Sequence, residues 1–279
     1  MKTVVITGAS DGIGLECASQ IAALPGHRLV LIGRTPAKLE AAVRRLADES
    51  PGAPVTSYAC DFARLDDVRR LAGSLLDDCE RIDVLVDNAG TVFDKRTLTV
   101  DGHESTFAVN HLAPFLLTEL LLDRIAASTP ARIVITSSTG HYGGTLNFDD
   151  LGFERGYSIM RAYSRSKLAN VLYTRHLARR LDGTGVTANC VHPGTVATRI
   201  WSGAPWFARP VLALVKRVAM ISPAEGGRTL THLATDPALD GVTGLYFDGL
   251  EPKRASDLAL DDTLADRLYD ESRHLVGLA

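Results

Sequence analysis

The most constraining feature of this chain is a regular alternation between short apolar, β-branched runs and longer helical patterns. Strands that alternate with helices of ten or more residues form βαβ units, which build a parallel sheet. We therefore expect an α/β fold with a doubly wound parallel sheet of about seven strands and helices on both faces. The expected strands are 3–6, 29–32, 55–59, 84–86, 132–136, 186–191 and 244–247. The expected helices are 12–24, 37–48, 65–78, 101–125, 161–181 and 224–235.

Length and composition fit a single domain over residues 1–279, although two smaller domains would also fit the length. Apolar residues make up 46% of the chain and charged residues 23%, which excludes a disordered chain or a small disulfide scaffold. Lysine and arginine number 30 against 33 aspartates and glutamates, so no nucleic-acid partner is expected. The four cysteines are far apart and lack metal-ligand spacing, which predicts buried thiols and no metal site.

The amino terminus shows only about four consecutive apolar residues, too few for a signal-peptide core or a membrane span. No other stretch reaches about 18 uncharged apolar residues. The expected location is therefore cytoplasmic.

Two loops, 140–158 and 195–222, exceed the roughly two to six residues usual between a strand and a helix. Each follows the carboxyl end of an expected strand, where open α/β sheets bind ligands, so both are expected to be substrate-loop insertions. The second loop holds both tryptophans, and the first holds Tyr142, Phe148, Phe153 and Tyr157. These aromatic residues suggest a lid over an apolar substrate. Packing onto the core is the alternative, and Arg209 and Lys216 leave membrane contact as a third hypothesis for the second loop.

A glycine-rich turn joins the first expected strand to the first helix. It reads Thr7-Gly8-Ala-Ser-Asp-Gly12-Ile-Gly14. Glycine lets a backbone turn sharply and approach a pyrophosphate closely, and the helix amino terminus offers free N–H groups to phosphates. The turn therefore predicts a dinucleotide site, with a tight turn that binds nothing as the alternative.

This turn resembles the cofactor loop of the short-chain dehydrogenase/reductase family. Further motifs of that family follow in order over nearly the whole chain: Asp87-Asn88-Ala89-Gly90, Asn110, Ser138, Tyr163 with Lys167, and Pro193-Gly194. The runs 110–115 and 166–170 are most similar to the retinol-dehydrogenase-like branch. The family more often has asparagine where this chain has Asp87, and we expect Asp87 to cap the turn all the same. The resemblance implies a Rossmann-type oxidoreductase that acts on CH–OH groups.

Arg34 ends the second expected strand, and no carboxylate stands there to repel a 2′-phosphate. A solvated arginine at the start of a surface helix is the alternative. In the family, arginine at this place goes with NADP, so the resemblance implies NADP(H) in preference to NAD(H). Asp61 matches the family's contact to the adenine amino group, and it could also cap a helix. The cofactor-binding residues that the resemblance implies are Gly8, Ser10, Asp11, Gly12, Ile13, Gly14, Arg34, Asp61, Phe62, Asn88, Ala89, Gly90, Tyr163, Lys167, Pro193, Gly194 and Thr198.

Tyr163 and Lys167 are four residues apart on an expected helix and so share a face. An ammonium beside a phenol favours phenolate, so we expect Lys167 to lower the pKa of Tyr163 and make it a general acid and base. The resemblance implies that Ser138, rather than Ser137, polarises the substrate oxygen and that Asn110 holds a water near Lys167. The implied catalytic residues are therefore Asn110, Ser138, Tyr163 and Lys167.

The predicted function is an NADP-dependent oxidoreductase that interconverts a lipophilic alcohol and its ketone or aldehyde by hydride transfer. Two alternatives stay open: an NADP-sensing module without turnover, and an epimerase or dehydratase that uses the cofactor transiently. The expected partner is a small lipophilic substrate. The resemblance leaves open a homodimer that pairs through helices 101–125 and 161–181. His141 is expected at the surface, although it could touch substrate.

Overall fold

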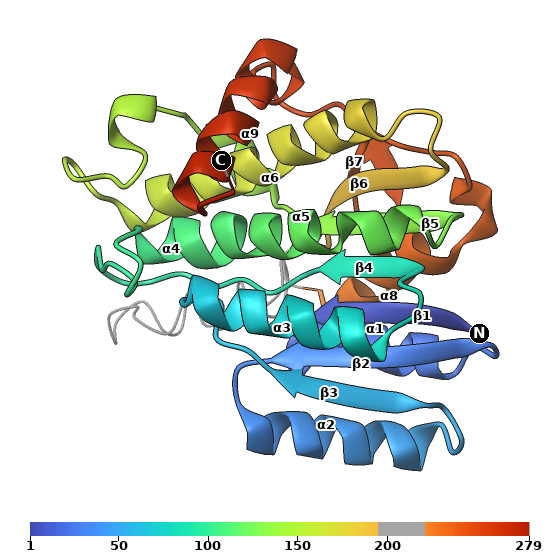
Figure 1. Cartoon of the computed structure of the whole chain (residues 1–279). Coiled ribbons are helices and arrows are strands. Elements are labelled where there is room, and N and C mark those ends of the chain that lie inside the picture. The colour runs from blue at the N-terminus through green and yellow to red at the C-terminus, as the bar shows by residue number, and fades with distance from the viewer. Residues whose placement is uncertain (195–220, 279) are drawn as a thin grey trace.

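The computed structural model describes residues 1–194 and 221–278. Within these residues, eight strands form one sheet in the order β3-β2-β1-β4-β5-β6-β7-β8 (Figure 1). Strands β1 to β7 run parallel, and β8 pairs antiparallel with β7. The strands are β1 Lys2–Thr7, β2 His27–Gly33, β3 Val55–Ala59, β4 Val84–Asp87, β5 Ala131–Thr136, β6 Val186–His192, β7 Tyr246–Asp248 and β8 Glu251–Lys253.

The expected doubly wound sheet is confirmed, with each predicted strand within two residues of its observed bounds. The eighth strand is not predicted, because β8 has only three residues and contains Pro252. Proline lacks the N–H group of a ladder and is tolerated at a sheet edge, which is where β8 lies.

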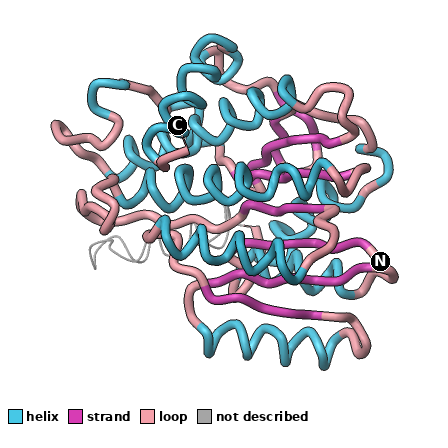
Figure 2. Tube along the Cα trace, in the orientation of Figure 1, coloured by secondary structure: helices cyan, strands magenta, loops and turns pink. Residues whose placement is uncertain are grey.

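Helices cover both faces of the sheet, as expected (Figure 2). One apolar core lies between the sheet and α1, α2 and α8, and a larger core lies on the other face, beneath α3, α5, α6 and α9. The helices are α1 Gly12–Ala22, α2 Pro36–Glu49, α3 Leu65–Asp78, α4 Ser105–Phe107, α5 Ala113–Ala126, α6 Ile159–Arg180, α8 Pro223–Thr235 and α9 Asp262–Leu275, with a π-helical turn Ala108–Leu112 between α4 and α5. The run Ser105–Ala126 is long and apolar enough to cross a membrane by composition, but its apolar 18-residue stretch is 83% buried inside the protein, as in a core helix.

The helix expected from residue 101 begins four residues later, at Ser105. Glu104 caps it by accepting from the N–H groups of Thr106 and Phe107, both at 2.8 Å. Asp101 lies outside the helix and accepts instead from Leu65 N, at the start of α3. Asp101 and Glu104 have the spacing of a capping box, but each acid caps a different helix.

Helix α9 is not predicted from the sequence, and it covers part of α6. Arg175 and Arg179 of α6 both pair with Asp262 of α9. Every residue from Glu104 to Thr118 is buried within the chain, and so is nearly every residue from Ala162 to Thr174. These stretches of α5 and α6 are therefore already covered within one chain.

Arg165 of α6 holds the 140–158 insertion against the body of the protein. Its buried guanidinium donates to the carbonyl oxygens of Thr145 at 2.9 Å, Asp150 at 2.6 Å and Leu151 at 2.8 Å. It also stacks 3.5 Å above the ring centroid of the fully buried Phe153.

Two further aromatic side chains of the insertion are held by hydrogen bonds. The Tyr157 hydroxyl donates to the Phe93 carbonyl at 3.0 Å, and the Tyr142 hydroxyl donates to the Arg254 carbonyl at 2.6 Å. The packing alternative therefore describes this insertion better than a lid does. The lid and membrane-contact hypotheses for 195–222 concern a segment of which only Ile221 and Ser222 are among the described residues.

Asp87 ends β4 with its side chain buried. Thr118 Oγ1 donates to Asp87 Oδ2 at 2.8 Å, and within the described part of the chain Oδ1 has no hydrogen-bond partner. Burial raises the pKa of this carboxyl to about 7. The turn that Asp87 was expected to cap is held by Thr7 Oγ1, which accepts from the N–H groups of Asn88 and Ala89 at 2.9 Å. That expectation is wrong, because the carboxyl points into the core.

This burial predicts that Asp87→Asn stabilises the protein in a pH-dependent way. The folded-state pKa lies above the unfolded value of about 3.9, so the wild type loses stability as pH rises from about 4 to about 7 and stays at the lower level above that. Asparagine has the same shape without the charge. The gain in free energy of unfolding should be about 4 kcal/mol at pH 8 and should shrink towards pH 5. Chemical denaturation of both proteins at pH 5 to 8 measures it, and an equal gap at pH 5 and pH 8 would show that the charge is not the cause.

Candidate active site

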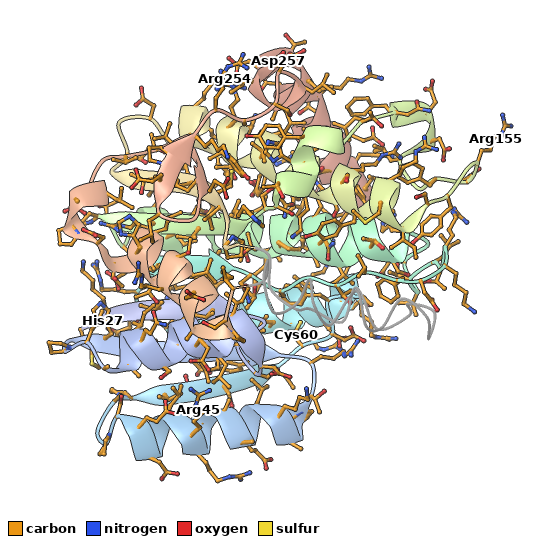
Figure 3. The ribbon with its side chains drawn as sticks, turned by 180° about the vertical axis from the view of Figure 1, so that it is seen from behind. His27, Arg45, Cys60, Arg155, Arg254 and Asp257 are labelled. Atoms are coloured by element: carbon orange, nitrogen blue, oxygen red, sulfur yellow. The ribbon has the colours of Figure 1, made fainter. Side chains whose placement is uncertain are left out.

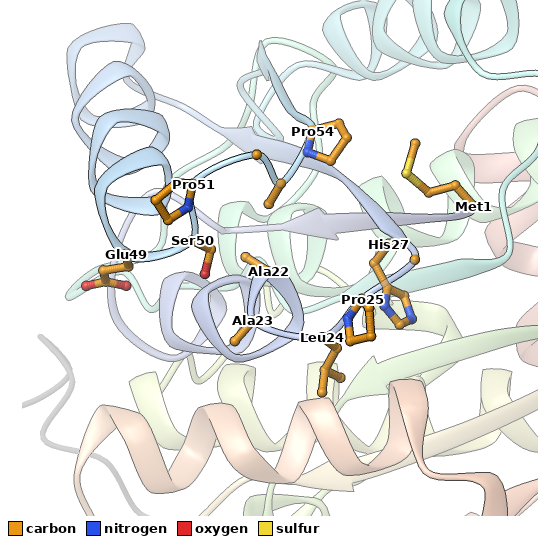
Figure 4. Close-up of a pocket in the computed structure, with 13 residues that line it drawn as sticks. Met1, Ala22, Ala23, Leu24, Pro25, His27, Glu49, Ser50, Pro51 and Pro54 are labelled. Carbon is orange, nitrogen blue, oxygen red and sulfur yellow. The ribbon is translucent and has the colours of Figure 1, made fainter.

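The candidate residues gather at the carboxyl edge of the parallel strands, around the ends of β1, β4, β5 and β6. In Figure 3 this edge lies on the side from which Arg155 of the insertion projects, and His27 marks the opposite, amino edge. A hollow of about 540 Å³ opens at the amino edge, lined by Met1 and the segments 22–27 and 49–54 (Figure 4). Since the candidate residues lie at the other end of the strands, this hollow is not their substrate site.

The glycine turn has the backbone that a bound pyrophosphate needs. Gly8 and Gly12 have positive φ values of 67° and 58°, which disfavour any side chain. A Cβ on Gly14 would lie 2.4 Å from the Gly8 carbonyl oxygen, so the turn closes tightly onto the start of α1. Asp11 caps α1 by accepting from Gly12 N at 2.8 Å and also pairs with Lys38 Nζ. The amino end of α1 therefore faces the turn, as a phosphate cradle requires.

The segment Asn88–Gly90 lies directly beside this turn. Asn88 Nδ2 donates to the Thr7 carbonyl at 3.0 Å, in addition to the two backbone bonds that Thr7 Oγ1 accepts. A Cβ on Gly8 would lie 3.0 Å from Ala89 Cα. The structure therefore brings Gly8, Asn88, Ala89 and Gly90 together as the sequence predicts.

Arg34 and Asp61 lie at the ends of neighbouring strands, β2 and β3. The two ends are joined by the Cys60 N–H group, which donates to the Gly33 carbonyl at 3.0 Å. Arg34 is exposed, and Ser10 lies close by, because a Cβ on Gly33 would meet Ser10 Oγ at 2.9 Å. Asp61 Oδ1 accepts from Ala63 N at 3.1 Å, so this residue does hold a turn, and one carboxylate oxygen remains for another contact. Phe62 is buried.

Ser138 and Tyr163 meet where β5 ends and α6 begins. The Ser138 side chain lies close enough to the Tyr163 phenol to counter the rise in its pKa, and its Oγ accepts from Gly140 N at 3.1 Å. Gly140 packs against the phenol, since a Cβ there would lie 3.2 Å from Tyr163 Cε1. Ser137 points elsewhere and donates to the Lys167 carbonyl at 2.9 Å. Of the two serines, Ser138 is thus the one that reaches the phenol.

Lys167 lies 5.7 Å from the centre of the Tyr163 ring and is buried. Its ammonium donates to the Thr136 carbonyl at 3.1 Å. Burial lowers the pKa of Lys167 to about 8. It raises the pKa of Tyr163, while the Ser138 hydrogen bond acts in the opposite direction. The expectation that Lys167 lowers the pKa of Tyr163 is therefore not met: burial of the phenol raises this pKa, and the opposing effect comes from Ser138.

Asn110 lies in the π-helical turn, opposite Gly90 and Lys167. Its Oδ1 accepts from Thr91 N at 2.7 Å, and its Nδ2 donates to the Thr91 carbonyl at 2.9 Å and to Ser166 Oγ at 3.1 Å. A Cβ on Gly90 would lie 3.3 Å from Asn110 Oδ1 and 3.6 Å from Lys167 Nζ. The side chain of Asn110 therefore fixes the walls of the site.

His141 departs from its expected place at the surface. It is fully buried; its Nδ1 lies 2.7 Å from the Ser138 carbonyl, and its Nε2 accepts from Ser256 N at 3.2 Å. Because Nε2 is an acceptor, Nδ1 must carry the proton and donate to Ser138. His141 thus supports the backbone of Ser138. The only feature of the sequence that indicates this role is the position of His141, three residues after Ser138.

The last predicted residues follow β6. Pro193 and Gly194 are described, and Gly194 has a positive φ of 102°. Thr198 lies outside the described residues.

Comparison with known proteins identifies the family and supports the fold. A model of the short chain dehydrogenase family matches residues 2–205. Human retinol dehydrogenase 13 is 40% identical over 282 residues, which covers 99% of this chain and 85% of that protein. Mouse retinol dehydrogenase 14 is 41% identical over 289 residues, covering 99% and 86%.

Solved structures agree. An uncharacterized protein from Mycobacterium paratuberculosis has a TM-score of 0.79 and 33% identity, covering 99% of this chain and 94% of that one. A short chain dehydrogenase from Shigella flexneri in complex with NADP shares the fold, with a TM-score of 0.69 and 24% identity over 90% of this chain and 97% of that one. The chain therefore belongs to the short-chain dehydrogenase family, in its retinol-dehydrogenase-like branch, and is an oxidoreductase of CH–OH groups.

Proposed function

We propose that this protein is an NADP(H)-preferring oxidoreductase that interconverts a lipophilic alcohol and its ketone or aldehyde, with Tyr163 as general acid and base. The observation that carries the proposal is the meeting of Ser138, Tyr163 and Lys167 at the edge of the sheet that also holds the glycine turn. Relatives named as retinol dehydrogenases support an alcohol of apolar character.

The residues around the glycine turn fit a dinucleotide. The close approach of Gly14 to Gly8 leaves backbone N–H groups facing the place of a pyrophosphate. Arg34 supplies a cation and no opposing carboxylate at the end of β2, which favours a 2′-phosphate. When bound, the nicotinamide supplies the hydride or accepts it. The NADP in the Shigella flexneri structure supports this choice of cofactor.

The chemistry of the side chains favours carbonyl reduction at neutral pH. Because burial raises the pKa of Tyr163, its phenol is protonated and can donate to the oxygen of a carbonyl as negative charge develops there. Ser138 can donate a hydrogen bond to the same oxygen. Lys167 adds a positive charge near the phenol and stabilises the phenolate that forms when the proton leaves.

The alternatives make different predictions for a simple assay. A sensor would bind NADPH and leave its fluorescence stable in the presence of a panel of carbonyl compounds, whereas a dehydrogenase would consume it. An epimerase or dehydratase would convert its substrate with no net change in NADPH. Net consumption with an apolar aldehyde or ketone is the result that we expect.

Cofactor preference depends on Arg34. We expect the wild type to prefer NADPH over NADH at least tenfold in kcat/KM, or about 1.4 kcal/mol. Arg34→Ala should lose most of this preference through weaker NADPH affinity. Arg44→Ala removes an exposed charge from α2 away from the strand end and serves as the control. Equal use of both cofactors by the wild type would refute the assignment of Arg34.

Tyr163→Phe keeps the ring and removes the proton carrier. It should lower kcat at least a hundredfold, since positioned acids and bases contribute about 10²–10⁴-fold, and should leave NADPH affinity unchanged. In the wild type, a protonated phenol predicts a carbonyl reduction rate that is constant from pH 6 to 8 and an alcohol oxidation rate that rises over the same range. Single-turnover kinetics at several pH values test both. Near-normal reduction by the Tyr163→Phe protein would mean that another group carries the proton.

A further inference from the structure

A buried network of hydrogen bonds lies behind Lys167 and joins α6, the end of β5, the π-helical turn and α9. Asn170 is at its centre. Its Nδ2 donates to the Asn110 carbonyl at 3.0 Å and to the Thr136 carbonyl at 3.1 Å. Its Oδ1 lies 3.2 Å from His111 Nδ1, and His111 Nε2 lies 2.9 Å from Ser272 Oγ.

The direction of every bond in this network is fixed by its chemistry. Two backbone carbonyls can only accept, so Asn170 must present its NH₂ group to them and its Oδ1 to His111. His111 Nδ1 must then carry a proton, and in the neutral ring Nε2 accepts from the Ser272 hydroxyl. Burial lowers the pKa of His111 to about 4, which keeps the ring neutral. Asn170, His111 and Ser272 are all nearly inaccessible to solvent.

The network meets Lys167 at one atom, the Thr136 carbonyl oxygen. The Thr136 carbonyl oxygen accepts from Lys167 Nζ and from Asn170 Nδ2, both at 3.1 Å. The ammonium and the amide therefore share one acceptor. A change in the position of the amide would change how strongly this carbonyl holds the ammonium.

We propose that Asn170 and His111 are positioning residues for Lys167, with His111 fixing the orientation of the Asn170 amide and the amide fixing the Thr136 carbonyl. Ser272 extends the network to α9, so the carboxyl-terminal helix contributes to the geometry of the site. The inference rests on the proposed function for its effect on turnover, but its effect on Lys167 is measurable without turnover.

The tautomer of His111 is the first test. In protein labelled with ¹⁵N-histidine, the His111 signals are identified by their loss in His111→Phe. We expect Nδ1 to be protonated, Nε2 to be unprotonated, and neither to titrate between pH 5 and 8. A proton on Nε2, or titration near pH 6.5, would overturn the network.

The second test measures the titration of Lys167 by NMR of labelled lysine, with the signal assigned through Lys167→Met. His111→Phe keeps a ring among Phe107, Phe115 and Tyr173 and leaves no space beside Lys167, but it removes the donor to Asn170. Lys167 Nζ and Asn170 Nδ2 donate to the same Thr136 carbonyl. When the Asn170 amide no longer donates to it, the hydrogen bond from the Lys167 ammonium should become stronger and favour the charged form of the lysine. We expect the pKa of Lys167 to rise by half a unit or more in His111→Phe and in Asn170→Ala.

Asn189→Ala is the matched control. Asn189 is also a buried amide that bridges backbone groups, donating to the Val242 carbonyl at 2.7 Å and accepting from Leu245 N at 3.1 Å. Among the residues described, Asn189 has no hydrogen bond to Lys167 or to the Thr136 carbonyl. It should lower the melting temperature and leave the titration of Lys167 unchanged.

Turnover completes the test. Asn170→Ala should lower kcat for alcohol oxidation at least tenfold and shift its pH profile, with the KM for the alcohol within about twofold of the wild type, whereas Asn189→Ala should keep the wild-type profile. If Asn170→Ala and His111→Phe lose stability but keep the titration of Lys167, the two residues are structural only and the inference is wrong. A wild type that shows no turnover would refute the proposed function, and the Lys167 titration would still decide the inference.

Discussion

The burial of the Lys167 ammonium is the constraint on which the rest of the site depends. A charged group that is 4% exposed needs a partner, and here the partner is the main-chain carbonyl at the end of β5. That requirement ties α6 to the carboxyl edge of the sheet and fixes Tyr163 one helical turn before the lysine. Ser137 strengthens the same junction by donating to the Lys167 carbonyl. The geometry of the proposed catalytic site is thus a consequence of how the buried Lys167 ammonium finds a hydrogen-bond acceptor.

Burial also decides the charge states. Sequence reasoning treats Tyr163 and Lys167 as an isolated pair, in which a nearby cation lowers the pKa of the phenol. In the folded protein both side chains are desolvated, and desolvation favours the neutral form of each. The phenol therefore stays protonated at neutral pH, and the ammonium titrates closer to neutrality than a free lysine.

The sequence predicts the parts of the fold that depend on local patterns. The seven parallel strands follow from their apolar runs. Glycines reveal the turn, because Gly8 and Gly12 have positive φ values and Gly14 leaves no room for a Cβ. What the sequence does not reveal depends on contacts between distant segments. Arg165 looks like any helical arginine until its side chain is seen to hold the insertion. Asp101 and Glu104 have capping-box spacing, yet they cap different helices. His111 and Asn170 stand in separate motifs 59 residues apart, and nothing in either motif shows that they bond.

The transfer of a labelled hydride tests the proposed function most directly. The protein is incubated with NADPH that carries deuterium at the transferable position, together with an apolar ketone, and the product is analysed by mass spectrometry. We expect an alcohol that carries one deuterium on the former carbonyl carbon, formed by the wild type and at least a hundredfold more slowly by Tyr163→Phe. NADPH recovered unchanged beside unreacted ketone, although it binds, would contradict oxidoreductase activity on such substrates and would favour a sensor.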